Sequence, residues 1–235
     1  MIEETYRIKA IVLKRQPFRE HDLLITAYSP EKGKQALIAR GARKFRSKIA
    51  AHVEPFCFID CMVVRGKTHD YMGSALSSNC LVGIKSDFDR VEAASRVCRF
   101  FDKTIKEGQP DITLFVELRD ILALIDGVQH AEDAALWADL SIFRLLSRTG
   151  YEPDLHRCVF CGSKPDAEGI MLDQAKNGIV CQRCAGQAKG LTISENAVKL
   201  LRLANELEIS RFRNLKVDRS LALEISLITT RLMEQ

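Results

Sequence analysis

Four of the chain's eight cysteines stand in two close pairs, a pattern that can hold a metal ion. Cys158 and Cys161 form the first pair, Cys181 and Cys184 form the second, and 19 residues separate the pairs. Thiolates at this spacing lie on tight turns and point toward one ion, and two such turns complete a tetrahedron. The sequence therefore predicts one Zn²⁺ ion, held by these four cysteines in a closed, structural site that takes no part in a reaction.

Other interpretations of the cysteines have less support. A thioredoxin-like redox pair needs a βαβ setting, and no such pattern surrounds either pair. His156 can replace one thiolate, but four thiolates already fill the shell, so we expect this histidine not to bind. The other cysteines are expected to be buried thiols without disulfides, because the N-terminal sequence lacks a signal-peptide pattern and the cytosol is reducing. They are Cys57, Cys61, Cys80 and Cys98.

A second pattern is the basic segment 34–48, which contains no acidic residue. Its cations can neutralise phosphates, and the ring of Phe45 offers a face on which a base can stack. A solvated basic loop without a partner is the alternative, and Phe45 is equally suited to anchoring the loop. Because only 7% of residues are aromatic, contacts with the DNA backbone are favoured over recognition of individual bases. The predicted DNA-binding residues are Lys34, Arg40, Arg43, Lys44, Arg46 and Lys48.

Charge is distributed unevenly along the chain, whose net charge is +4. Residues 1–85 carry 15 lysines and arginines against 8 acids, whereas residues 86–150 carry 8 against 12. This asymmetry indicates a polyanionic partner for the N-terminal region. No apolar run approaches the length of a membrane span, so we expect a cytoplasmic protein without a membrane partner.

The first 80 residues have the hydrophobic alternation of short strands. The turn signals between them are residues 16–17, 30–33 and 66–67, and the basic segment forms an irregular connection. Five strands in this arrangement favour a Greek-key barrel of the OB type, although an SH3-like barrel fits nearly as well. The expected strands cover residues 5–15, 21–29, 34–40, 53–65 and 68–77.

From residue 87 the apolar period changes to about 3.6, which is typical of helices. Asp87, Asp111 and Ser194 stand where helix N-caps belong, and further helices are expected over 131–148 and 220–233. We expect an α+β multidomain chain in which helices on both sides of the zinc module pack as one bundle. The predicted domains are an OB-fold DNA-binding domain at 1–80, helical parts at 81–154 and 187–235, and a zinc module at 155–186.

Sequence motifs of enzymes are missing. The chain has no P-loop, dinucleotide fingerprint, nucleophile elbow or metalloprotease motif, and its five histidines are scattered. A binding protein is therefore favoured over an enzyme. The rival functions are a zinc-ribbon adaptor in transcription or translation, which would bind DNA weakly, and a metal-dependent nuclease, for which no carboxylate cluster is evident.

Several segments resemble the RecO family of bacterial recombination mediators. They are REHDLL at residues 19–24, SPEKGK at 29–34, GARKFRSK at 41–48, EPF at 54–56 and LLSRTGYEPDL at 145–155, followed by the first cysteine pair. Together they cover the chain nearly end to end. The sequence LWADL at 136–140 departs from the Arg-x-Phe-Glu pattern that members often carry there.

The resemblance implies an N-terminal OB fold, a helical domain and an inserted zinc module. It also implies binding of single- and double-stranded DNA, annealing of complementary strands and, with RecR, loading of RecA onto DNA coated by single-strand DNA-binding protein. By position, the six predicted DNA-binding cations become the DNA contacts. Because of the departure at 136–140, the site for the tail of the single-strand-binding protein is not placed on named residues. Some members lack the four cysteines, which supports a structural role for the metal.

Overall fold

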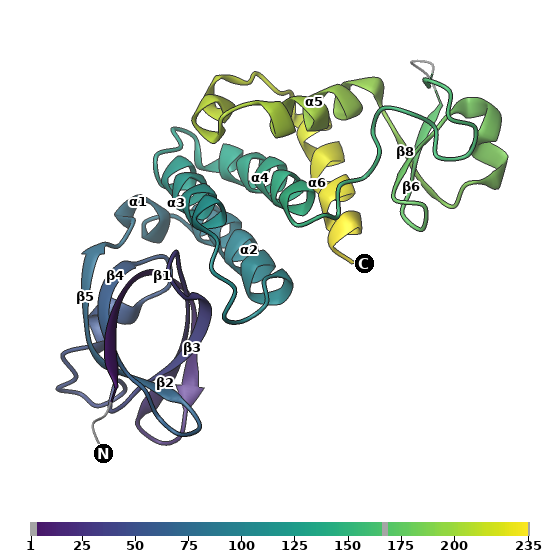
Figure 1. Ribbon diagram of the computed structural model, residues 1–235. Helices are drawn as coiled ribbons and strands as arrows, with labels where there is room; N and C mark the ends of the chain where they lie inside the picture. The colour runs from purple at the N-terminus through teal and green to yellow at the C-terminus, as the bar shows by residue number, and fades with distance from the viewer. Residues whose placement is uncertain (1–3, 166–168, 235) are drawn as a thin grey trace. The chain divides into compact units, whose positions relative to one another are not determined.

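The computed structural model describes residues 4–165 and 169–234 of the chain (Figure 1). Its contacts divide it into two compact units, Met1–Gly127 and Val128–Gln235. The first unit holds a β-barrel and three helices, and the second holds further helices and a small sheet. Among the described residues, no helix is both long and apolar enough to cross a membrane.

The five strands of the first unit close into a barrel, as predicted. Their order around the barrel is β1-β2-β3-β5-β4, and the pair β3–β5 that completes the closure is parallel, with Leu37 opposite Asp70. This Greek-key order identifies the barrel as OB-like and decides against the SH3-like alternative. The strands are β1 (Thr5–Phe18), β2 (Asp22–Ser29), β3 (Gly33–Ala39), β4 (Phe58–Val64) and β5 (Asp70–Asn79).

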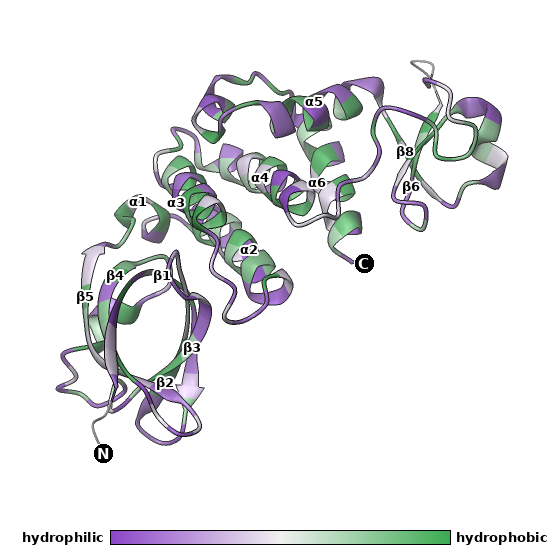
Figure 2. Cartoon of the chain, in the orientation of Figure 1, coloured by the Kyte–Doolittle hydropathy of each residue, from purple (hydrophilic) through white to green (hydrophobic). Residues whose placement is uncertain are grey.

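Alternation along the strands fills the barrel with apolar side chains. On β1, Ile8, Ala10 and Val12 are buried, whereas Lys9 between them is exposed. The register with β2 shifts between Val12 and Lys14, so a bulge bends this long strand and lets it pair with both β2 and β4. In Figure 2 green hydrophobic stretches lie along the strands, while the loops below the barrel are mostly purple and hydrophilic.

The strand expected over 53–65 begins later, at Phe58. The preceding residues Ala50–Val53 form the short 3-10 helix η1, and Phe56 has a φ of 69°, a conformation that no regular strand residue adopts. The chain therefore turns before β4 starts.

Three helices complete the first unit, and the N-caps of the two longer ones are the predicted residues. The Asp87 carboxylate accepts from the backbone N–H of Arg90 at the start of α2 (Phe88–Thr104). Asp111 accepts from two N–H groups at the start of α3 (Ile112–Asp126), and Gly127 follows the end of that helix. The four-residue helix α1 (Val82–Lys85) connects β5 to α2. These caps satisfy donors that a helix N-terminus otherwise leaves free.

In the second unit, helices from both sides of the cysteine module contact one another. Arg144 of α4 (Ala134–Arg148) donates to the carbonyls of Asn205 at 2.8 Å and Leu207 at 2.9 Å, where α5 (Glu195–Glu206) ends. Helix α6 (Arg219–Met233) contacts both α4 and α5. The expected packing across the module is therefore present for these helices, whereas α2 and α3 belong to the unit of the barrel. The finer domain boundaries stay a prediction.

The cysteine module is built on a three-stranded sheet that the sequence did not predict. The order is β7-β6-β8, with both pairings antiparallel. The strands are β6 (Ile170–Asp173), β7 (Gly178–Val180) and β8 (Gly190–Ile193), and the 3-10 helix η3 (Gln182–Gln187) follows β7.

One prediction about the cysteines is wrong. Cys57 and Cys80 are joined by a disulfide, although both were expected to be free thiols. Their neighbours Phe58 and Asn79 are partners in the β4–β5 pairing, so the register places the two cysteines side by side despite a separation of 23 residues. Cys61 and Cys98 are free and buried, as predicted.

Candidate nucleic-acid interface and metal centre

The basic segment forms a loop between β3 and η1 whose backbone is held by hydrogen bonds. The backbone N–H of Gly41 donates to the Asp22 carboxylate at 2.8 Å, and the N–H of Arg43 donates to the carbonyl of His21 at 2.9 Å. Gly41 has a φ of 63°, which a glycine adopts without a steric penalty. Further bonds within the loop join Lys44 to Gly41 and Ser47 to Lys44. The loop is therefore fixed to the barrel at several points along its backbone.

The loop brings most of the predicted DNA-binding cations together at the surface. Arg43, Lys44, Arg46 and Lys48 are all exposed. Arg40 is also exposed, at the start of the loop, and its guanidinium lies 3.8 Å from the centre of the Tyr71 ring. Together these side chains form a positively charged surface suited to phosphates.

Lys34 is placed apart from the other five cations. It is only 7% exposed, and its ammonium donates to the backbone carbonyl of Asp102 on α2. A buried lysine in a hydrogen bond stabilises the packing of this helix against the barrel. The structure thus places Lys34 inside the fold, unlike the five exposed cations.

Phe45 is fully exposed, at 103% of its reference accessibility. It therefore does not anchor the loop, and the anchoring side chains are instead Ala42 and Val53, which are buried in the barrel core. A bare aromatic ring among cations is unfavourable in water and is well suited to stacking on a base. Of the two roles predicted for Phe45, the geometry favours stacking.

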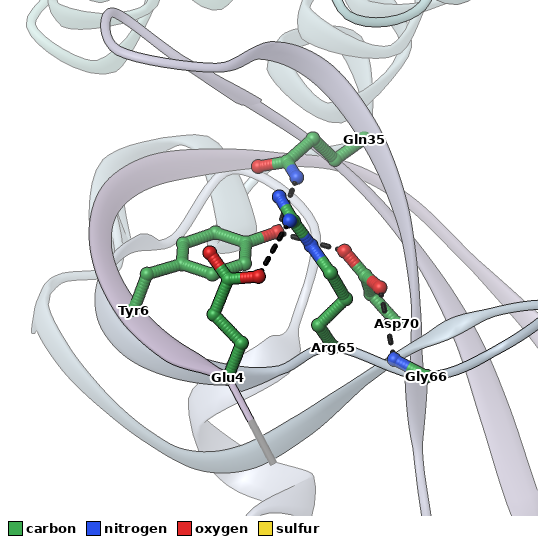
Figure 3. A network of polar contacts seen from close by, with 6 residues as sticks. All are labelled: Glu4, Tyr6, Gln35, Arg65, Gly66 and Asp70. Carbon is green, nitrogen blue, oxygen red and sulfur yellow. Dashed lines mark hydrogen bonds and ion pairs between the residues drawn. The ribbon is translucent and has the colours of Figure 1, made fainter. Parts of the chain in front are cut away.

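A cleft of about 680 Å³ lies at one end of the barrel, beside the β4–β5 loop (residues 65–69). Inside it the Tyr6 hydroxyl donates to the Asp70 carboxylate at 2.9 Å and accepts from the Gln35 amide at 2.8 Å (Figure 3). The other oxygen of Asp70 accepts from the N–H of Gly66, and Arg65 pairs with Glu4 at 2.7 Å. These bonds hold the cleft open in a defined shape. Sequence reasoning missed it, because its residues come from positions 6 to 110.

The surroundings of Tyr6 in this cleft raise the pKa of its hydroxyl. Burial is the main cause that raises the pKa of Tyr6, and the neighbouring Asp70 carboxylate adds to it. A tyrosine hydroxyl is protonated at neutral pH even without this shift, so it serves here as both donor and acceptor.

The four paired cysteines meet as predicted. The sulfur atoms of Cys158, Cys161, Cys181 and Cys184 all lie within 4.8 Å of one another, and those of Cys161 and Cys181 are 3.7 Å apart. Four sulfurs at about 2.3 Å from a metal ion stand about 3.8 Å apart in a tetrahedron, so the spacing fits an ion at their centre. His156 is exposed and is not part of this group.

Tight turns in the backbone aim these sulfurs at one point. The N–H of Gly162 donates to the carbonyl of Cys158 at 2.8 Å, and the N–H of Cys184 donates to that of Cys181 at 2.9 Å. Each turn places the sulfur atoms of both cysteines of a pair on the same side of the backbone. The N–H of Val159 also donates to the carbonyl of Ile179 on β7, which ties the first turn to the sheet. The four thiols can hold one metal ion in this arrangement.

The sequence matches two family models that together cover almost all of it. Residues 1–78 match the N-terminal domain of recombination protein O, and residues 85–235 match its C-terminal domain. The chain is similar to curated proteins named DNA repair protein RecO. Identity is 33% over 222 residues for the protein of Desulforamulus reducens, which covers 94% of this chain and 85% of the relative. It is 28% for those of Dehalococcoides mccartyi (94% and 87% covered) and Syntrophomonas wolfei (90% and 83%).

Proposed function

The chain belongs to the RecO family of DNA repair and recombination proteins, and we propose that it acts as a non-enzymatic mediator that binds single- and double-stranded DNA. The observation that carries this proposal is the exposed, acid-free loop with Arg43, Lys44, Arg46 and Lys48, fixed on an OB-like barrel. Its cations supply affinity for phosphates that does not depend on sequence.

Annealing of complementary strands follows from this charge. Two DNA strands repel each other, and a surface that neutralises phosphates on both lowers the barrier to their meeting. Such a mechanism needs charge screening and proximity and no chemical step. The proposed partners are RecR, single-strand DNA-binding protein and, indirectly, RecA, which the mediator would help load onto coated DNA. Its proposed location is the cytoplasm, associated with the nucleoid.

We propose Zn²⁺ as the ion of the four-cysteine site. Four thiolates in a closed tetrahedral set are the ligands typical of structural zinc. Bound there, the ion would join the turn at Cys158 to the turn at Cys181 and so hold the module's small sheet in place. All four ligand positions would be taken by protein sulfur, which leaves no place for a substrate.

Salt dependence of binding tests the proposal about the loop. Fluorescence anisotropy of a labelled single-stranded oligonucleotide would be measured over a salt series. The wild type is compared with a variant in which all four loop cations are glutamates. Each neutralised phosphate contributes about 0.7 to the slope of log affinity against log salt, so four contacts give a slope near −3 in the wild type. We expect weak, nearly salt-independent binding for the variant.

A matched control distinguishes the effect of the loop cations on binding from the effect of the protein's net charge. Four exposed cations of the second unit are changed to glutamate in a second variant, which has the same formal charge as the first. They are Lys199, Arg211, Arg213 and Lys216. The control should keep the wild-type slope. Equal losses in both variants, or a flat wild-type slope, would refute the loop as the DNA site and favour the adaptor interpretation.

A further inference from the structure

Aromatic rings at the barrel surface lie beside cations. The Arg40 guanidinium covers one face of the Tyr71 ring at 3.8 Å, and that of Arg19 lies 5.2 Å from the centre of the Phe18 ring. His69 meets Phe18 edge-on, with their ring centres 6.1 Å apart. The chain has few aromatic residues, but the fold gathers several of them here. This surface therefore offers rings for contacts to bases in addition to the backbone contacts that the composition favours.

These rings connect the basic loop to the cleft at the end of the barrel. Arg40 directly precedes Gly41, where the loop begins, and Tyr71 directly follows Asp70, which lines the cleft. His69 also lines the cleft, and its ring contacts the ring of Phe18. Neighbouring residues of the first unit thus link the loop, the rings and the cleft.

The cleft differs from the loop in its charge. The cations Lys32, Lys34, Arg65 and Lys67 line it together with the acids Glu31, Asp70 and Glu107. The Lys34 ammonium is already bound to the carbonyl of Asp102, and Arg65 is paired with Glu4. A nearly balanced set of charges gives little attraction for a phosphate. Its polar groups, which include the side chains of Gln35 and Thr68, instead suit a neutral group with several hydrogen-bonding atoms. Nucleobases have this chemistry, and about 680 Å³ is ample room for one.

We propose that the cleft and the adjoining rings of His69, Tyr71 and Phe18 bind unpaired bases of a single strand whose phosphates lie on the basic loop. The inference rests on the proposed function and adds to it a source of selectivity. Bases in a duplex are paired and stacked, and moving one out into a pocket costs a few kcal/mol. The loop therefore serves single and double strands alike, whereas the cleft and rings favour the single strand.

An abasic oligonucleotide separates base contacts from phosphate contacts. Its phosphates are those of an oligothymidine of the same length, but it has no bases. We expect the wild type to bind oligothymidine at least about tenfold more tightly than the abasic strand, because one stacked base contributes on that order. A variant with His69→Ala and Tyr71→Leu should lose most of this preference and keep only the part that Phe18 and Phe45 contribute. Binding of neither strand by the wild type would instead show that the proposed function itself fails.

A matched variant controls for the loss of a tyrosine and a histidine. His130→Ala with Tyr151→Leu removes the same residue types at exposed positions of the second unit, and it should keep the tenfold preference for bases. The inference would be overturned if the His69/Tyr71 variant kept the full wild-type preference for oligothymidine over the abasic strand. It would also be overturned if the wild type bound both strands with equal affinity.

Photocrosslinking of the unmodified protein tests the same site without a mutation. An oligonucleotide containing 5-iododeoxyuridine would be crosslinked by near-ultraviolet light, and the reduced protein digested with trypsin. The peptide Thr68–Lys85 contains both His69 and Tyr71 and should carry the crosslinked base. Crosslinks found only outside the cleft and these three rings, for example only at Phe45, would contradict a base-binding cleft even if the variants proved to be misfolded.

Discussion

The barrel and the cysteine module use different means to hold their strands in place. The barrel closes five strands around an apolar core that runs from Ile8 on β1 to Met72 on β5. In the module, the buried cluster around the cysteines consists, among the described residues, of Cys158, Val180 and Cys181, and the sheet also buries Ile170, Leu172 and Ile179. Two of the three residues in that cluster are candidate metal ligands. The barrel is therefore stabilised by burial of apolar surface, whereas the turns of the module would depend on the proposed metal ion as well.

This difference predicts how each region responds when its source of stability is removed. Loss of one core side chain weakens a barrel that retains many others. Loss of the proposed metal would leave four thiols facing one another at the point where the two cysteine turns meet. Conditions that break one region should therefore leave the other intact.

The largest effect is expected from the metal ligands. Changing Cys181 and Cys184 to serine should unfold the module, because metal binding contributes on the order of 10 kcal/mol in small zinc domains. Hydrogen exchange measured by mass spectrometry should show loss of protection over 155–193 and unchanged protection in the barrel strands. The same experiment on the wild type with a chelator should give the same pattern.

A control variant in the same turn tests whether the thiols are responsible. Gln182 and Arg183 lie between the two cysteines with exposed side chains. Changing these two residues to serine should leave the module's exchange unchanged. Full protection of the module in the cysteine variant would defeat the claim of structural metal.

A smaller effect is expected from the barrel core. Ile59 is 2% exposed on β4, and truncation to alanine should lower the free energy of unfolding by about 2–5 kcal/mol. Its neighbour Asp60 is exposed, and Asp60→Ala should change stability by no more than about 0.5 kcal/mol. Urea unfolding followed by circular dichroism would measure both. A stability loss in Ile59→Ala that disappears when the metal is removed would contradict independent stabilisation.

The smallest effect concerns alkaline pH. Burial raises the pKa of the Cys98 thiol from 9.0 to about 12, and burial followed by the Asp60 charge does the same for Cys61. Burial, with a contribution from Asp111, also raises the pKa of Tyr28 from 10.0 to about 12. Because the folded pKa values lie above the unfolded ones, this stability is fully present below pH 9 and is lost as the pH rises toward 12.

The module should show the opposite dependence, since protons compete with a metal for thiolates and acid releases the ion. Hydrogen exchange of each region across pH, corrected for the intrinsic rate, would test this. Barrel stability that stays constant between pH 9 and 11 would contradict the assigned role of Cys61, Cys98 and Tyr28.

Features set by short stretches of sequence were predictable. The caps Asp87 and Asp111 act on N–H groups two or three residues away, and the cysteine pairs lie on single turns. Strand alternation was likewise sufficient for a five-stranded barrel, although not for choosing between OB and SH3-like topologies, because the parallel β3–β5 pair joins distant segments.

Features that depend on tertiary packing were not predictable. Lys34 was grouped with the loop by its charge, but the carbonyl of Asp102, 68 residues away, determines where its ammonium lies. The pairing of β4 with β5 joins Cys57 to Cys80, and the network of Tyr6 with Asp70 spans 64 residues. No local pattern links such partners, since only the closed barrel brings them together.

The position of the module within the second unit has a consequence for synthesis on the ribosome. The barrel strands can pair once residue 79 has emerged, whereas α4 is completed at Arg148 and its partners α5 and α6 are made only after the module. While residues 149–194 are being translated, the apolar side of α4 has no α5 or α6 to cover it. Capture of an ion by the four cysteines falls within this interval. We therefore expect a shortage of metal to leave the nascent module without its cross-link at the stage when α4 is still uncovered.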